Sequence, residues 1–249
     1  MTMALRECLY NGRRFDIGYD IVNPDRERSI LFLHGWGSDR DIMRNCFGTL
    51  LPDMKHIYVD MPGFGRSPNG EFLTTDDYAG IVSRFMSDIS TTPDIVVGHS
   101  FGGKVATLMN PPCIVLLSSA GVRVPKPLSV RVKISLYRLF KPLGGSILRK
   151  FFVSSDAKGM NDGMYETFKY TVNEDFEEKF SLLNGKCLLY WGREDTATPL
   201  WTAERIKERV DGAKLFVLDG GHYFFLEHAG EIASGIESSC IGRERGGEI

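Results

Sequence analysis

Short apolar runs alternate with longer stretches of helical spacing along most of the chain. The runs are rich in Val, Ile, Leu and Tyr, and most are apolar almost throughout. Such strands need cover on both faces, which a parallel sheet flanked by helices provides. The predicted strands span 15–23, 30–34, 55–60, 94–99, 113–119, 187–192 and 213–219, and the predicted helices span 39–51, 76–90, 101–109, 200–210 and 227–240. The pattern predicts an α/β fold with a mostly parallel central sheet, whose ligands bind at the carboxyl ends of the strands.

One long segment interrupts this alternation. Between the predicted strands at 113–119 and 187–192 the chain contains three prolines, a Gly-Gly pair and two helix-like stretches. That is too long for a loop in a compact fold, so we expect an inserted helical cap. The predicted organisation is a catalytic domain of residues 1–120 and 181–249, with the cap over residues 121–180.

Composition excludes several classes of partner. The 249 residues are 43% hydrophobic and 25% charged, with a net charge of −2. Such a chain has no bulk attraction to nucleic acid or to an anionic membrane. The longest nearly apolar run, "CIVLLSSAGV", is too short to span a bilayer. The N-terminal stretch has no uninterrupted apolar leader, so we expect a cytoplasmic protein.

The five cysteines are odd in number, scattered, and form no C-x-x-C pair. This spacing argues against a disulfide framework and against a structural zinc site. Cys113 and Cys187 begin apolar runs, so we interpret both as core thiols. No metal site is predicted.

"VVGHSFGGKVA", residues 96–106, places Ser100 between Gly98 and Gly102, after a predicted strand and before a predicted helix. In a G-x-S-x-G turn the serine is exposed above the sheet at the positive end of the next helix, and larger side chains at the glycines would collide. Ser100 is therefore the candidate nucleophile; the alternative is a plain turn serine.

A nucleophilic serine needs a base. His222, in "LDGGHYFFLEH", follows the last predicted strand and two glycines, so its imidazole can reach a neighbouring strand end. The alternative is a surface loop histidine. His34, His56 and His99 lie on strands or strand ends, where a packed, hydrogen-bonded role is expected, and His228 lies in the last helix, facing solvent.

An acid must orient the base and stabilise its charged form. "CLLYWGREDTATP" ends a strand and then turns, which makes Asp195 the first candidate and leaves Glu194 and Asp219 as alternates. The order Ser100, Asp195, His222 is that of the α/β-hydrolase class.

"FLHGWGS" closes the strand at 30–34 with a turn of small residues. Here the backbone N–H of Trp36, paired with that of Phe101, would form an oxyanion hole. The alternative is a turn that uses Gly35 and Gly37 only for backbone freedom.

The chain resembles the α/β-hydrolase fold superfamily, specifically the small capped serine esterases and the meta-cleavage-product C–C hydrolases. The matching stretches cover the whole catalytic domain: "HGWGS" (34–38), "DMPGFGRS" (60–67), "GHSFGG" (98–103), "GREDTATP" (192–199) and "GGHYFFLE" (220–227). The resemblance implies a cofactor-free hydrolase with a Ser-His-Asp triad. It also implies a structural turn at Asp60, to which we therefore give no catalytic role.

The resemblance gives chemistry rather than substrate. Hydrolases of aromatic meta-cleavage products usually carry asparagine before the nucleophile and tryptophan after the catalytic histidine, whereas this chain has His99 and Tyr223. An ester or thioester is therefore the first expectation and C–C hydrolysis the alternative. A further alternative is a receptor-like protein with slow hydrolysis, although an intact triad counts against pure binding.

Charge in the predicted cap gives a separate indication. Residues 121–150 hold eight Lys or Arg and no acidic residue, while 161–178 are acidic. Two solvated faces that neutralise one another are one interpretation. The other is a basic entrance, including Arg131, Lys133 and Arg138, that attracts an anionic substrate, a membrane surface or an acidic acyl carrier protein, as in esterases that act on carrier-bound acyl groups.

Overall fold

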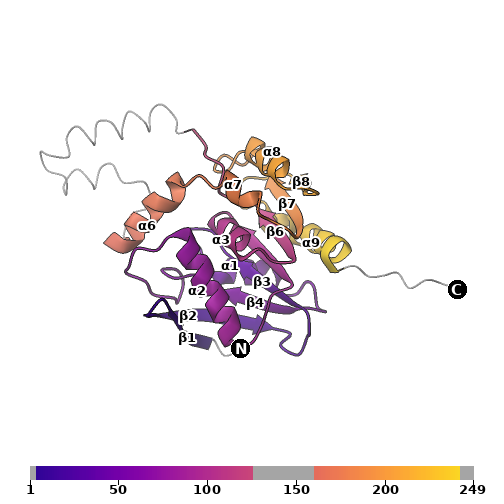
Figure 1. Cartoon of the computed structure of the whole chain (residues 1–249). Coiled ribbons are helices and arrows are strands. Elements are labelled where there is room, and N and C mark those ends of the chain that lie inside the picture. Colours follow the sequence, from indigo (N-terminus) through magenta and orange to yellow (C-terminus); the bar gives the residue numbers. More distant parts are fainter. Residues whose placement is uncertain (1–3, 126–159, 242–249) are drawn as a thin grey trace, which may run out of the picture.

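The computed structural model describes residues 4–125 and 160–241 of the chain (Figure 1). Within these residues eight strands form one sheet, in the order β1-β2-β4-β3-β5-β6-β7-β8. The strands are β1 (Ala4–Tyr10), β2 (Arg13–Val22), β3 (Ser29–Leu33), β4 (Lys55–Val59), β5 (Ile95–His99), β6 (Cys113–Leu117), β7 (Lys186–Gly192) and β8 (Lys214–Leu218). The six strands from β4 to β8 in this order are parallel, which confirms the predicted fold class.

The helices outside the predicted cap lie close to their predicted positions, whereas no helix bounds were predicted within residues 121–180. The helices are α1 (Arg40–Phe47), α2 (Thr75–Asp88), α3 (Phe101–Met109), α6 (Asp162–Asn173), α7 (Glu177–Phe180), α8 (Leu200–Arg209) and α9 (Phe225–Ile236), followed by a short π-helix, η3 (Glu237–Ile241). No helix in the described ranges combines the length and the apolar character needed to cross a membrane.

The edge strand β1 is absent from the sequence prediction. It pairs antiparallel with β2, which in turn pairs antiparallel with β4. An edge strand with one open side exposes apolar as well as polar residues. Here Leu5 and Leu9 are exposed. The alternation in "ALRECLY" is therefore too weak to predict a strand.

Two cores lie on opposite faces of the sheet. One packs side chains of α2, α3 and α8 against the sheet, and the other packs α1 and α9 (Figure 1). The residues of β3, β5 and β6 are all buried, as the continuously apolar runs predicted.

The strand order reverses between β3 and β5. From β3 the chain proceeds to β4 on one side, and it later returns to place β5 on the other side of β3. Ligands of open α/β sheets bind where this reversal opens a crevice beyond the carboxyl ends of the strands. The turn "HGWGS" follows β3 and Ser100 follows β5, so the topology places these two segments side by side.

Helix α6 is fastened to the main body of the fold by a buried ion pair. Lys104 of α3 is 1% exposed, and its ammonium group pairs with Glu174 at the end of α6 and donates to the Thr171 carbonyl at 3.0 Å. Burial lowers the pKa of Lys104, although the carboxylate of Glu174 opposes this shift. The pair joins the helix that follows Ser100 to the predicted cap. Since residues 126–159 lie outside the described part, the cap itself stays a prediction.

The structure corrects one prediction about the cysteines. Cys113, at the start of β6, forms a disulfide with Cys240 of η3, whereas the sequence prediction made it a core thiol. The two residues are 127 positions apart, so no spacing motif reveals the pair. Cys187 is the buried thiol that was expected, and burial raises its pKa to about 12.

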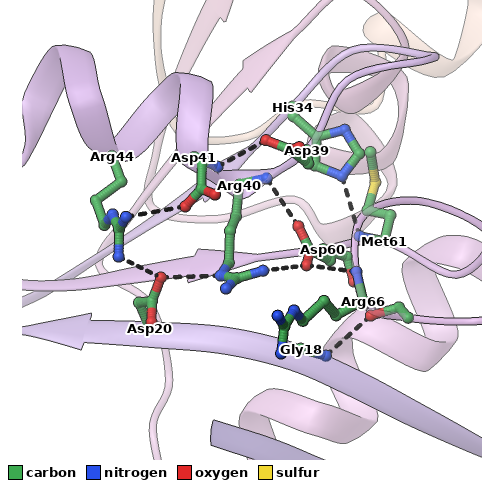
Figure 2. A network of polar contacts seen from close by, with 11 residues as sticks. Gly18, Asp20, His34, Asp39, Arg40, Asp41, Arg44, Asp60, Met61 and Arg66 are labelled. Atoms are coloured by element: carbon green, nitrogen blue, oxygen red, sulfur yellow. Dashed lines mark hydrogen bonds and ion pairs between the residues drawn. The ribbon is translucent and has the colours of Figure 1, made fainter. Parts of the chain in front are cut away.

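A polar network behind the turn "HGWGS" joins three segments of the chain (Figure 2). Asp60, fully buried after β4, accepts the backbone N–H of Arg40 at 2.8 Å and that of Arg66 at 2.9 Å. The Arg40 guanidinium lies between the carboxylates of Asp60 and Asp20, 2.8 Å from the latter. Asp60 therefore holds the start of α1 against the β4 end, which supports the structural role inferred for it.

We expect Asp60→Asn to lower the free energy of unfolding by about 3 kcal/mol or more, because it leaves the buried Arg40 charge without one of its two partners. Glu71→Gln is the matched control, since Glu71 pairs with Arg13 at the surface and should change stability by less than about 1 kcal/mol. Urea denaturation of the two variants measures the difference. Equal midpoints for both variants and the wild type would contradict the structural role of Asp60.

Candidate active site

Ser100 occupies the tight turn between β5 and α3. Its φ of 51° and ψ of −113° lie outside the ordinary regions for a residue with a side chain, as a strained strand-to-helix elbow requires. The Ser100 N–H donates to Leu117 at 3.1 Å, and the Ser100 carbonyl accepts from Ala120 at 3.0 Å. Both bonds tie the elbow to the end of β6, so the neighbouring strand stabilises the strained conformation.

The glycines of the elbow are required by backbone contacts, as predicted. A Cβ on Gly98 would lie 2.4 Å from the Gly102 carbonyl oxygen. A Cβ on Gly102 would lie 2.5 Å from the carbonyl oxygens of both Leu33 and His34. The beginning of α3 therefore packs directly on the end of β3, and no side chain fits between them.

Asp195 and His222 come together from two neighbouring strand ends. The Nδ1 of His222 is 2.8 Å from Oδ2 of Asp195. The Asp195 side chain is fully buried, while that of His222 remains 20% exposed. A buried carboxylate on Nδ1 fixes the tautomer that leaves Nε2 free to accept a proton.

Asp195 is held as an anion by its own loop. Its Oδ1 accepts the N–H groups of Ala197 and Thr198 at 2.8 and 2.9 Å, and the Thr198 hydroxyl lies 2.8 Å from Oδ2. Burial opposes ionisation, but the hydrogen bond and charge of His222 and the Thr198 N–H outweigh it and lower the pKa of Asp195 to about 2. Sequence reasoning missed Thr198, although an aspartate followed by a turn that returns N–H groups to it is a readable pattern.

The two alternate acids are engaged elsewhere. Glu194 accepts the N–H of Gly220 at 2.6 Å, and Asp219 is exposed and pairs with Arg193 at 3.1 Å. Of the three carboxylates considered, Asp195 is the one that contacts His222.

The three histidines on strands or strand ends behave as expected, whereas His228 is less exposed than predicted. His34, His56 and His99 are buried and hydrogen-bonded. His34 accepts the Met61 N–H on Nε2 at 3.1 Å (Figure 2). Its Nδ1 therefore carries the hydrogen and donates to the Gly35 carbonyl at 2.8 Å. His228 is only partly exposed and lies 3.1 Å from the Asp219 carbonyl.

The predicted oxyanion donors lie on the two segments that meet at the strand reversal. Phe101 is the first residue of α3, so its N–H has no acceptor within the helix. Trp36 lies inside a turn that is closed by a hydrogen bond from the Ser38 N–H to the Gly35 carbonyl. The N–H of Trp36 takes no part in this hydrogen bond. The Trp36 ring packs against Phe64, Phe101 and Phe168 of α6, which shields this side of the turn from water.

A cavity of about 370 Å³ adjoins the Asp195 loop. Its lining comes from the segment after β6, the end of α6 and the segment after β7, and it includes Val122, Val124, Val172, Ala197 and Thr198. The lining also includes the charged Arg123 and Glu174, so the wall is of mixed polarity, and the volume suits a small organic ligand.

The cap residues Arg131, Lys133 and Arg138 lie outside the described residues. Of the acidic stretch 161–178, the structure pairs three carboxylates within reach of basic groups: Glu166 with Lys169, Glu174 with Lys104, and Glu177 with Arg205. These three basic partners lie outside the stretch 121–150, so both interpretations of the cap charges stay predictions.

No group of three or more His, Cys, Asp or Glu side chains that could hold a metal ion occurs among the described residues. His222 and Asp195 are in contact, and Ser100 occupies its strained elbow at the same carboxyl edge of the sheet. The set suits acyl transfer.

A family model described as "Alpha/beta hydrolase family" matches residues 30–234. The chain belongs to the alpha/beta hydrolase family. A pimeloyl-[acyl-carrier protein] methyl ester esterase from Neisseria meningitidis is 23% identical over 85% of this chain and 92% of its own length.

Solved alpha/beta hydrolases share the fold. An esterase from Exiguobacterium antarcticum aligns with a TM-score of 0.72 at 19% identity, covering 92% of this chain and 97% of its own. A meta-cleavage product hydrolase from Pseudomonas fluorescens aligns with a TM-score of 0.69 at 20% identity, covering 94% and 96%.

We expect Gly102→Ala to lower kcat for ester substrates by about a hundredfold, because its Cβ would push the end of β3 away from the elbow and misplace the oxyanion turn. Gly230→Ala in α9 is the matched control, since no atom lies within 4 Å of its Cβ position. The control should keep full activity. Ester turnover at matched folded protein, checked by circular dichroism, measures both, and an active Gly102→Ala enzyme would contradict the packing argument.

Proposed function

We propose that the protein is a serine hydrolase that cleaves a carboxylic ester or thioester through Ser100, His222 and Asp195. The observation that carries the proposal is the 2.8 Å contact of His222 with the buried Asp195, beside a strained serine at the strand reversal. An imidazole oriented in this way by a carboxylate can act as a general base for a neighbouring hydroxyl.

In the proposed reaction, Nε2 of His222 takes the proton of the Ser100 hydroxyl as the oxygen attacks the carbonyl carbon. The N–H groups of Trp36 and Phe101 stabilise the oxyanion that forms. His222 then gives the proton to the leaving group, and an acyl group remains on Ser100. Water, activated by the same histidine, releases the acid and restores the serine.

Within the described ranges, the Ser100 hydroxyl makes no hydrogen bond to His222. Catalytic hydrogen bonds often tighten only when substrate is bound. Asp195 remains ionised throughout the neutral range, because its pKa is lowered to about 2. The carboxylate can therefore stabilise the imidazolium that forms in each proton transfer.

The proposed substrate carries a short or medium acyl chain. The cavity of about 370 Å³ beside Thr198 supports this, because it has room for a small ligand. The predicted cap of residues 121–180 would cover this edge of the sheet and define the rest of the pocket.

More specifically, the proposed substrate is an acyl group bound to a carrier protein. The Neisseria meningitidis relative is named as an esterase of a pimeloyl methyl ester on acyl carrier protein. The basic stretch that includes Arg131, Lys133 and Arg138 would attract such an acidic partner. The predicted cytoplasmic location stays a prediction, and the Cys113–Cys240 disulfide counts against a strongly reducing compartment.

We expect the wild type to release p-nitrophenol from a series of short and medium acyl esters, and Ser100→Ala to lower kcat by a factor of about a thousand or more. The acyl chain length that is cleaved fastest then indicates the length of the acyl-binding pocket. Undiminished turnover in Ser100→Ala would contradict the assignment of the nucleophile. If the wild type cleaves no ester of the series, a 2-hydroxy-6-oxo-dienoate and a carrier-bound acyl ester test the remaining substrates, and inactivity on all of them would contradict the proposal.

A further inference from the structure

His99, the last residue of β5, joins the elbow to the loop of the catalytic base. Its side chain is fully buried, and its Nε2 lies 3.0 Å from the backbone carbonyl oxygen of His222. A carbonyl oxygen only accepts hydrogen bonds, so Nε2 of His99 must carry the hydrogen. The imidazole next to the nucleophile therefore donates to the main chain of the base.

The His99 ring is neutral and has one bare nitrogen. Burial, together with the nearby charge of His222, lowers the pKa of His99 to about 3. With the hydrogen on Nε2, Nδ1 is unprotonated, and it is buried without a hydrogen-bond partner among the residues that the structure describes. A bare acceptor in that position costs less than an unpaired N–H or a buried charge would.

The His99 ring lies between the predicted oxyanion turn and the loop of His222. A Cβ on Gly35, in the predicted oxyanion turn, would lie 2.8 Å from Nδ1 of His99 and 3.2 Å from Cβ of Ser100. On its other side the His99 ring centroid is 4.7 Å from that of His222 and 4.8 Å from that of Phe225. One side chain therefore contacts both the oxyanion turn and the loop of the base.

The backbone of the loop before His222 has the freedom that glycines allow, so a contact that fixes its position matters. Gly220 and Gly221 precede the histidine, and Gly220 has a φ of 110°, a conformation that only glycine adopts readily. The contact with Asp195 fixes the rotation of the imidazole, but the position of the ring also depends on the His222 main chain. The hydrogen bond from Nε2 of His99 to the His222 carbonyl oxygen fixes the position of that main chain directly.

We propose that His99 is a positioning residue, whose Nε2–H holds the His222 main chain so that the imidazole of the base stays within reach of the Ser100 hydroxyl. The inference rests on the proposed function, because it assigns the base role to His222. It also accounts for a polar residue at a fully buried position beside the nucleophile.

Two substitutions of similar length separate the hydrogen bond from packing. His99→Gln places an amide N–H where the imidazole N–H lies, whereas His99→Met fills similar space without a donor. His56→Met is the matched control, because His56 is a buried histidine of β4 that also contacts a backbone carbonyl, that of Leu51 at 3.0 Å, but at the opposite end of the sheet. Steady-state ester kinetics, thermal unfolding and amide hydrogen exchange are measured for all three variants.

We expect His99→Gln to keep kcat within about threefold of the wild type, and His99→Met to lower kcat by about ten- to a hundredfold at nearly unchanged KM. Amides of residues 219–224 should exchange faster in His99→Met than in His99→Gln. His56→Met should lower the melting temperature without lowering kcat per folded molecule.

Equal kcat and equal exchange in His99→Gln and His99→Met would overturn the proposal and leave His99 a packing role only. The exchange comparison is independent of activity, so it decides whether the bond holds the His222 loop even if no ester is cleaved. A wild type without ester turnover would instead count against the proposed function.

Discussion

The direct packing of the α3 backbone on the end of β3 is the constraint on which the site depends. Gly98 and Gly102 leave no room for side chains, so the elbow that carries Ser100 lies against the carbonyls of Leu33 and His34. Because the strand order reverses at this pair of strands, the same contact brings the predicted nucleophile beside the predicted oxyanion turn. Any side chain at Gly102 would separate the two.

Buried polar groups then fix the loops around this contact. The predicted oxyanion turn is held from behind by His34 and by the Asp60–Arg40 pair, and the proposed base, His222, is held by Asp195 and His99. Each of these groups sits where an unpaired polar atom would be costly, so each specifies one arrangement of its loop. Burial also keeps His34 and His99 neutral, because it lowers the pKa of both. In the proposed mechanism one histidine acts as the base, while these two others stay buried and uncharged.

Local patterns in the sequence predicted the parallel strands, the elbow and the meeting of Asp195 with His222, because chain order and strand ends place them. The pairings between distant segments were not predictable. Arg40 with Asp20 and Asp60, Lys104 with Glu174, and Cys113 with Cys240 each depend on how elements far apart in sequence pack. The disulfide shows the limit most clearly, because spacing alone made Cys113 a core thiol. Similarly, His99 was predicted to be packed, but its bond to the His222 carbonyl required the fold.

The proposed reaction requires Ser100 to be an activated nucleophile. A fluorophosphonate reacts with such a serine and remains attached to it, so intact-mass analysis followed by peptide mapping tests the claim without knowledge of the substrate. We expect one adduct, on the peptide that contains Ser100, with none formed on Ser100→Ala or on the unfolded wild type. No adduct, or equal labelling of the wild type and Ser100→Ala, would contradict it.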